Sequence, residues 1–261
     1  LQRQYREGHT LVYRMNGINE NWHYSLRATG VVKKDGASRF YEEYQWSFIE
    51  PAASPSAQTS DFRQHISLDS DQNPSLPDLS KVDPKMIGPI TDFMTFYADL
   101  WLANKLGQLN KPGDHFYFRN PMPPSSWADG TRVLVGLSVT DFDMTLKSVD
   151  AATGTAMLEV RHVPPEKSAL PQKAAWMQDL VGSAPNNWMT IEKEADGFHA
   201  GVGEETFDAL IKVSLMDGRI LSATLENPVK TIERICTDEA LTQCGPRQPH
   251  LIVRKIEIEA Q

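Results

Sequence analysis

The sequence predicts a mainly β protein: a large curved antiparallel meander sheet, half-barrel or barrel-like, wrapped around one apolar helix. Three observations lead to this fold class. Long intervals without proline alternate with proline-bearing stretches, and proline is excluded from the interiors of strands and helices. Apolar and polar residues alternate in most of these intervals, which is the period of a strand. One interval has instead the three-and-four spacing of a helix.

The first 50 residues contain no proline and predict three strands. Apolar residues alternate with polar ones over residues 11–15, 22–29 and 40–48. Short segments rich in Gly, Asn and Asp separate these runs and predict tight turns. The alternation returns more weakly over residues 61–68, so we expect a fourth strand there.

Residues 90–106 predict the one strong helix. Its apolar side chains recur at spacings of three and four, and Asp92 and Asp99 lie on a narrow polar edge. Asp83 or Thr91 can cap its start. Because the helix is apolar over so much of its circumference, it has to be enclosed by a concave surface or inserted into a partner.

The rest of the chain returns to the alternation of strands. We expect strands at residues 133–139, 142–146, 156–160, 188–194, 207–215, 221–225, 229–235 and 251–259. A second helix can form near residues 173–181, with Trp176, Met177 and Leu180 facing inward. A sheet of roughly ten strands must curl or close. We expect a single domain over residues 1–261, with a possible subdivision near residues 112–130, where prolines cluster.

A curled antiparallel sheet around one apolar helix resembles the half-barrel architecture of the bacterial outer-membrane lipoprotein carriers and related envelope lipid-binding proteins. The resemblance rests on the layout of the elements, and no functional residue is carried over from it. It implies a fold that encloses a lipid-like ligand.

The composition excludes several classes of function. The 261 residues carry 26 Lys and Arg against 34 Asp and Glu, a net charge of −8. A nucleic-acid surface needs a basic patch, so we expect no nucleic-acid partner. Metalloprotease, serine-hydrolase, P-loop and dinucleotide-binding motifs do not occur in the sequence. We therefore expect no catalytic residue that a motif reveals, no cofactor and no metal site.

Cys236 and Cys244 lie close together in a polar segment that contains Gly and Pro. No second cysteine pair accompanies them, so a small-loop disulfide is the natural interpretation, and it would require an oxidising compartment. We expect a periplasmic or extracellular, exported protein whose signal peptide has been removed before Leu1. The alternative is two unpaired thiols in a cytosolic protein.

Three ionisable residues interrupt apolar stripes of the predicted strands: Glu42, His162 and Arg254. An ionisable group on a concave apolar face must be paired, hydrated or titrated. We predict that one or more of the three line a cavity and orient the polar end of a ligand. A structural ion pair, or a strand end where the face is already wet, is the alternative.

The favoured function is binding of an apolar or lipid-like small molecule between the curved sheet and the helix, without catalysis. The predicted ligand-binding residues are Trp22, Tyr24, Glu42, Tyr44, Trp46, Phe93, Tyr97, Trp101, His162 and Arg254. If the aromatic members interlock without a void, there is no ligand site among them.

Two other functions stay open. The protein can be a structural or assembly subunit of a cell-surface complex, docking on another envelope protein through its aromatic helix or its proline-rich segment 120–127. It can also be a hydrolase that uses a carboxylate or a histidine, with an active site assembled from residues far apart in the sequence.

Overall fold

The computed structural model describes residues 1–36, 39–50, 57–69, 77–119, 125–128, 132–136, 141–164, 166–168, 170 and 173–261. Within these ranges, 14 strands form one antiparallel sheet. The strands are β1 (Thr10–Asn19), β2 (Trp22–Asp35), β3 (Arg39–Glu50), β4 (Gln64–Ile66), β5 (His115–Arg119), β6 (Ser125–Ala128), β7 (Arg132–Gly136), β8 (Asp141–Asp150), β9 (Thr155–Val163), β10 (Trp188–Glu194), β11 (Gly197–Glu205), β12 (Phe207–Ser214), β13 (Ile220–Cys236) and β14 (Gln248–Ala260). The helices are α1 (Ala57–Ser60), α2 (Pro84–Leu106) and the 3-10 turn η1 (Ala175–Gln178).

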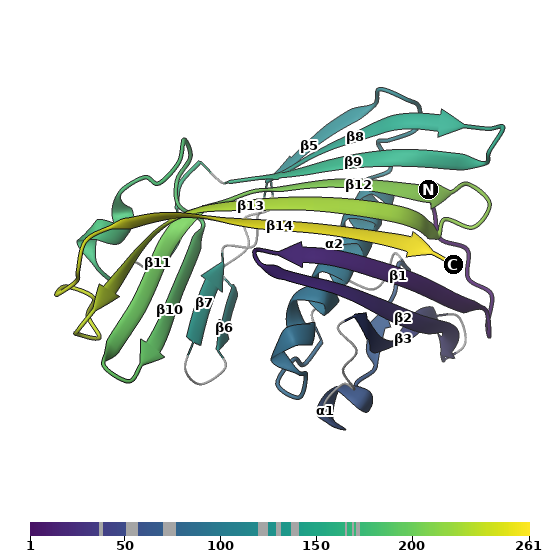
Figure 1. The fold of residues 1–261 in the computed structure, drawn as a ribbon. Helices are drawn as coiled ribbons and strands as arrows, with labels where there is room; N and C mark the ends of the chain where they lie inside the picture. Colours follow the sequence, from purple (N-terminus) through teal and green to yellow (C-terminus); the bar gives the residue numbers. More distant parts are fainter. Residues whose placement is uncertain are drawn as a thin grey trace.

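The long strands β13 and β14 run through the whole sheet and join its two halves (Figure 1). The first half has the order β4-β3-β2-β1-β14-β13-β12-β9-β8-β5, and the second half continues from the same two long strands through β11, β10, β7 and β6. Helix α2 lies on one side of the first half (Figure 1). No pairing among the described residues closes the sheet into a barrel. The predicted curved meander around a helix is therefore confirmed.

Pro228 lies inside β13, where the sequence predicts a break between two strands. Strand β13 pairs with β12 up to Glu226 and with β11 from Val229 onward. The Pro228 carbonyl accepts a hydrogen bond of 3.3 Å from the Thr206 N–H. Since the N and O of a strand residue face the same neighbour, the missing N–H of Pro228 faces the gap where the partner strand changes. The proline thus marks the junction of the two halves and does not end the strand.

Helix α2 begins at Pro84, earlier than the predicted residue 90. Asp83 caps it by accepting a 2.9 Å hydrogen bond from the Lys85 N–H, and Gly107 ends it with a left-handed φ of 60°. Pro89 lies in the second turn of the helix, where it removes one hydrogen bond of the ladder. Burial of Pro89 and of neighbouring apolar side chains against the sheet offsets this loss, so the helix extends back to Pro84, and of the two predicted caps Asp83 is confirmed.

The buried apolar residues form two clusters on opposite faces of the sheet. Ala223 and Leu225 of β13 belong to the first cluster, which packs between α2 and the sheet, while Cys236 belongs to the second and the partly buried Ile232 packs against it. The pairing of β13 with β14 has no bulge, so odd and even positions of β13 face opposite sides. The sheet therefore turns one face to α2 in its first half and the other face to a separate core in its second half.

The second core surrounds the disulfide between Cys236 and Cys244, which confirms the predicted bond. Closing so small a loop stabilises the fold by roughly 2–3 kcal/mol in the chain-entropy model. The helix expected near residues 173–181 is only the turn η1. Trp176 and Met177 are buried as predicted, but Leu180 is 62% exposed, so its inward orientation was wrong.

Candidate functional site

Buried polar side chains contact α2 in two groups. The first, the Glu42 cluster, consists of Arg3, Glu42, Tyr44 and Tyr97. The second, the junction cluster, consists of Asp92, Asp99, His162, Glu205, Asn227 and Arg254 and lies where β13 changes its partner. Together they contain five of the ten predicted ligand-binding residues, and they bring together side chains far apart in the sequence.

The Glu42 carboxylate is 0% exposed and fully hydrogen-bonded. Arg3 Nε donates to Oε1 over 2.9 Å, and the hydroxyls of Tyr44 and Tyr97 donate to Oε2 over 2.8 and 2.6 Å. Burial, reinforced by the Glu42 carboxylate, raises the pKa of Tyr44 and of Tyr97 well above the usual value. Both phenols therefore stay protonated and act as donors, and the carboxylate is held in place.

Arg3 is held by Glu42 but keeps one nitrogen unused. Its side chain is 1% exposed, and its Nη1 donates to the carbonyls of Gln4 (2.8 Å) and Asp217 (3.1 Å). The guanidinium carbon also lies 4.7 Å from the ring centre of Tyr5. Its Nη2 is buried and has no hydrogen-bond partner among the residues that the structure describes. A buried donor without an acceptor is unusual in a folded protein and calls for a physical explanation.

Arg3 lines a pocket of about 340 Å³ at the C-terminal end of α2, here named the helix-end pocket. Leu68, Trp101 and Leu109 supply apolar lining, and Lys105 supplies a second cation. Trp101 Nε1 donates to the Asp69 carbonyl over 3.3 Å, which ties the helix to the segment after β4. The Lys105 ammonium lies 4.3 Å from the centre of the Trp101 ring. This pocket combines apolar and cationic lining between α2 and the edge of the sheet.

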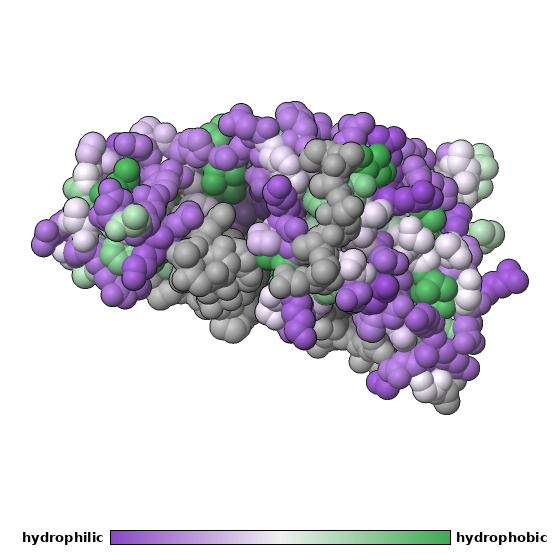
Figure 2. Space-filling model, turned by 60° about the horizontal axis from the view of Figure 1, so that its bottom comes forward, coloured by the Kyte–Doolittle hydropathy of each residue, from purple (hydrophilic) through white to green (hydrophobic). Residues whose placement is uncertain are grey.

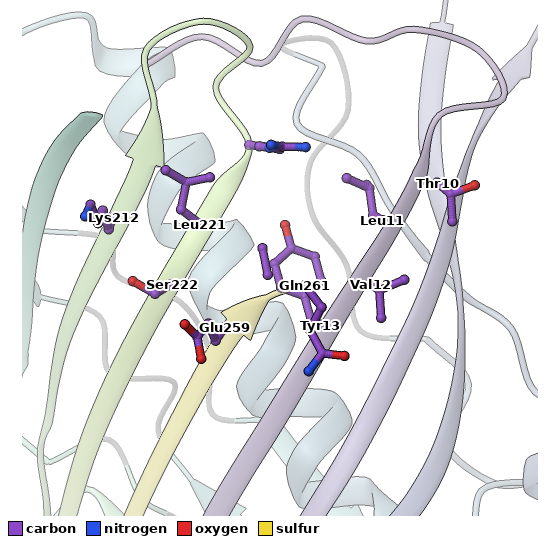
Figure 3. A pocket seen from close by; sticks show the side chains of 11 residues that line it. Thr10, Leu11, Val12, Tyr13, Lys212, Leu221, Ser222, Glu259 and Gln261 are labelled. Atoms are coloured by element: carbon purple, nitrogen blue, oxygen red, sulfur yellow. The ribbon is translucent and has the colours of Figure 1, made fainter. Parts of the chain in front are cut away.

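Two other pockets open on the sheet itself. One, of about 340 Å³, lies where β14 ends between β1 and β13 (Figure 3). There the Tyr13 hydroxyl donates to the Ile220 carbonyl over 2.8 Å and bridges β1 to β13. The other, of about 430 Å³, includes Asn16, Tyr24 and Ser25. Of the predicted ligand-binding residues, Trp101 therefore lines the helix-end pocket and Tyr24 lines this one.

Of the remaining predicted aromatic residues, Tyr44, Trp46 and Tyr97 pack around Phe93, and Tyr44 and Tyr97 also belong to the Glu42 cluster. The Phe93 ring centre lies 5.0 Å from that of Tyr44, 5.2 Å from Trp46 and 5.1 Å from Tyr97. Trp22 packs on Tyr24 at 4.6 Å. None of the three pockets described above is lined by Phe93 or Trp46. Whether this set contacts a ligand stays a prediction.

In the junction cluster, the carboxylate of Asp92 on α2 receives Arg254 Nη2 at 2.5 and 2.6 Å. Arg254 Nη1 donates to Asn227 Oδ1 over 2.9 Å, and Asn227 Nδ2 donates to Glu205 Oε1 over 3.2 Å. One further contact joins the helix to β9, where His162 Nε2 lies 2.9 Å from Asp99 Oδ1. The cluster fastens the helix to the strands at the point where the two halves meet.

Burial raises the pKa of Glu205, against the opposing influence of Arg254. Between the ordinary glutamate value of about 4.3 and the raised value, the folded protein binds more protons than the unfolded chain. The free energy of unfolding therefore falls as the pH rises through this window. We expect Glu205→Gln, which keeps an acceptor for Asn227, to gain stability relative to the wild type between pH 4 and pH 8, measured by urea unfolding. Glu226→Gln, at an exposed position of β13, is the control, and parallel stability curves for Glu205→Gln and wild type would contradict this expectation.

All three residues that interrupt the apolar stripes are paired in the fold. Glu42 binds Arg3, His162 binds Asp99 and Arg254 binds Asp92. For Glu42 and Arg254 this is the ion-pair alternative, whereas His162 is hydrogen-bonded to the Asp99 carboxylate, and the role of all three toward a ligand stays a prediction. Sequence reasoning missed Arg3, and it placed Asp92 and Asp99 on a polar edge although both are buried. The signal for the two aspartates was available, because a spacing of seven residues puts both on one helix face.

Comparison of the chain with protein-family models, with curated proteins and with solved structures finds no match. Among the described residues, no helix is long and apolar enough to cross a membrane. Of the proline-rich segment 120–127, residues 120–124 lie outside the described ranges, and Ser125 begins β6.

Proposed function

We propose that the protein is an exported bacterial envelope protein, without catalytic activity, that binds one lipid-like small molecule in the helix-end pocket. The observation that carries this proposal is the pocket of about 340 Å³ between α2 and the segment that follows β4. Its volume lies at the lower end of the range of small-molecule sites, and its lining combines a few apolar side chains with a larger number of polar ones. Leu68, Trp101 and Leu109 would contact the apolar part of the ligand.

The pocket suits such a ligand better than the other places where apolar side chains gather. The aromatic side chains around Phe93 contact one another, so a ligand there would have to displace them. In Figure 2 the described surface that faces the viewer is mostly hydrophilic, with hydrophobic residues in small separate groups. The Cys236–Cys244 disulfide is compatible with export, because such bonds persist in oxidising compartments.

The test is a titration with molecules that share one eight-carbon chain and differ in the head group: octanol, octanoate, octyl phosphate and octylamine. We expect saturable binding of at least one of them by calorimetry, with a change in the fluorescence of Trp101 that the variant Trp101→Phe lacks. Leu109→Asn should weaken the binding of every ligand that binds, because it replaces an apolar side chain of the wall by a polar amide without adding a charge.

Leu180→Asn is the matched control, since Leu180 is exposed in the second half of the sheet and does not line the pocket. It should leave the binding unchanged. The proposal fails if none of the four molecules binds saturably, or if Leu109→Asn binds them as the wild type does.

A further inference from the structure

Strand β5 forms one edge of the first half of the sheet, and among the described strands it pairs only with β8. Figure 1 shows β5 beyond β8, at the border of the sheet. We propose that this edge binds a second copy of the chain, with the two β5 strands antiparallel about a two-fold axis at Tyr117. The residues of β5 do not line the helix-end pocket, so this inference does not depend on the proposed function.

The backbone of β5 offers free hydrogen-bonding groups to a second copy. The Asp114 carbonyl, directly before β5, accepts a 3.0 Å hydrogen bond from the Leu146 N–H of β8. The pairing of β5 with β8 then runs without a bulge, and successive residues of a strand turn their N–H and C=O groups to opposite neighbours. The N–H and C=O groups of His115, Tyr117 and Arg119 therefore face away from β8, and no described residue is hydrogen-bonded to them.

A second copy satisfies all these groups in a single register. When Tyr117 lies opposite Tyr117 of the second copy, His115 lies opposite Arg119 of the second copy, and each such pair exchanges two hydrogen bonds. Tyr117 is the central residue of β5, so none of the outward-facing groups is left over. The register is self-complementary, as an interface with two-fold symmetry requires.

The aromatic side chains of β5 also fit this register. Phe116 and Phe118 lie on the same face of the sheet as Phe142, and Phe116 would lie opposite Phe118 of the second copy. This is a non-hydrogen-bonded position, where side chains of paired strands approach most closely. Within one chain the rings of Phe116 and Phe118 stack at 6.0 Å, and Phe118 lies 6.2 Å from Phe142. The pairing would extend this row of rings across the interface and shield it from water.

The charges on the other face of β5 are balanced within each chain. Arg119 binds Glu166 at 2.5 Å and lies 3.7 Å from Asp141. The imidazole of His115 contacts the Asp143 carboxylate. Like charges directly opposite each other weaken a strand pair, and these carboxylates offset the positive charge where His115 meets Arg119 of the second copy.

The other edges that the structure describes present fewer free groups. Strands β4 and β6 have only three and four residues. The first residues of β14 extend past β1, whose pairing with β14 ends at Arg254, but Pro249 removes a donor there. Proline on an edge strand is a common protection against pairing with another chain. Strand β5 contains no proline, so it is the edge best suited to a second copy.

Analytical ultracentrifugation of the whole chain tests the pairing. A five-residue edge makes a small interface, so we expect a reversible monomer–dimer equilibrium over about 10 μM to 1 mM protein, as in weak complexes. Tyr117→Pro removes the central N–H, which does not bond to β8, and should weaken the dimer about ten-fold or more because each dimer loses two hydrogen bonds. Tyr117→Phe is the matched control, since it keeps the N–H and loses only the hydroxyl bond to Asp141, and it should dimerise as the wild type does.

A cysteine at the two-fold axis tests the register even where the dimer is weak. Tyr117→Cys would place two thiols opposite each other, with Cα atoms about 5.5 Å apart, a distance that a disulfide spans. We expect a covalent dimer under mild oxidation. Val149→Cys, at an exposed position of β8 beyond its pairing with β5, should cross-link far more slowly.

Three results would overturn the proposal. The wild type can stay monomeric over the whole concentration range, which would leave the edge of β5 to a different partner. The dimer can persist unchanged in Tyr117→Pro, which would place the interface on another surface. Finally, Tyr117→Cys can cross-link no faster than Val149→Cys, which would exclude the register centred on Tyr117.

Discussion

Replacing Asp92 by alanine is expected to lower the free energy of unfolding by about 3–5 kcal/mol. The Asp92 side chain is 5% exposed, and its two carboxylate oxygens both bind Arg254. Without them the guanidinium of Arg254 would lie at the junction of the two halves with only Asn227 as a described hydrogen-bond partner. Of the nearby carboxylates that act on Arg254, whose side chain is 20% exposed, Glu205 would remain, and removing one partner of such a pair costs more than the pair itself contributes. Urea unfolding followed by circular dichroism measures the effect.

Two further variants separate the buried charge from other effects of the substitution. Glu226→Ala removes the exposed partner of Lys255, the residue next to Arg254, and should change the stability by about 0–1 kcal/mol. Asp92→Ala combined with Arg254→Met removes both charges and should recover most of the loss. A double variant as unstable as Asp92→Ala would show that the loss comes from packing of the helix and not from the unpaired charge.

The fold class was predictable because it depends on patterns that are local in the sequence. The alternation of strands such as residues 22–29 and the spacing of three and four in α2 both follow from which side of an element is buried. The rule that proline is excluded from the interiors of strands and helices was a weaker guide to the elements, since it treats every proline alike. Pro228 is compatible with a strand because the neighbour on its N–H side changes there. The change of partner strand depends on the order of the strands in the sheet, and the sequence of a single strand does not reveal that order.

Only some residues of the candidate site were predictable from the sequence. Glu42, His162 and Arg254 stood out because each breaks an apolar stripe, and burial of each charge requires a partner. The partners depend on which strands face the helix, and this is set by the sheet order. Arg3 lies before β1 in a segment with no periodicity, so nothing in the sequence marks it. Its unused nitrogen becomes visible only when the donors and acceptors around it are placed in space.

Replacing Phe93 by alanine is expected to lower the free energy of unfolding by about 3–5 kcal/mol, the usual range for a buried phenylalanine. Phe93 is 0% exposed and lies at the centre of the aromatic set between α2 and the sheet. Its ring centre lies 5.4 Å from Tyr13, 5.0 Å from Tyr44 and 5.2 Å from Trp46, all three in edge-to-face contact. Truncation removes these contacts and leaves a cavity whose walls come from different strands and cannot close over it.

The same measurement decides between a packed core and a ligand cavity at this position, because the two interpretations expect different results. Leu180→Ala, at an exposed apolar position, is the control and should stay within about 0.5 kcal/mol of the wild type. A Phe93 side chain that lined an open ligand cavity would lose few contacts on truncation, and Phe93→Ala would then cost less than about 1 kcal/mol without ligand. A loss this small would indicate that the ligand binds between the helix and the sheet. The expected large loss leaves the helix-end pocket as the place where a ligand can bind without displacing the core.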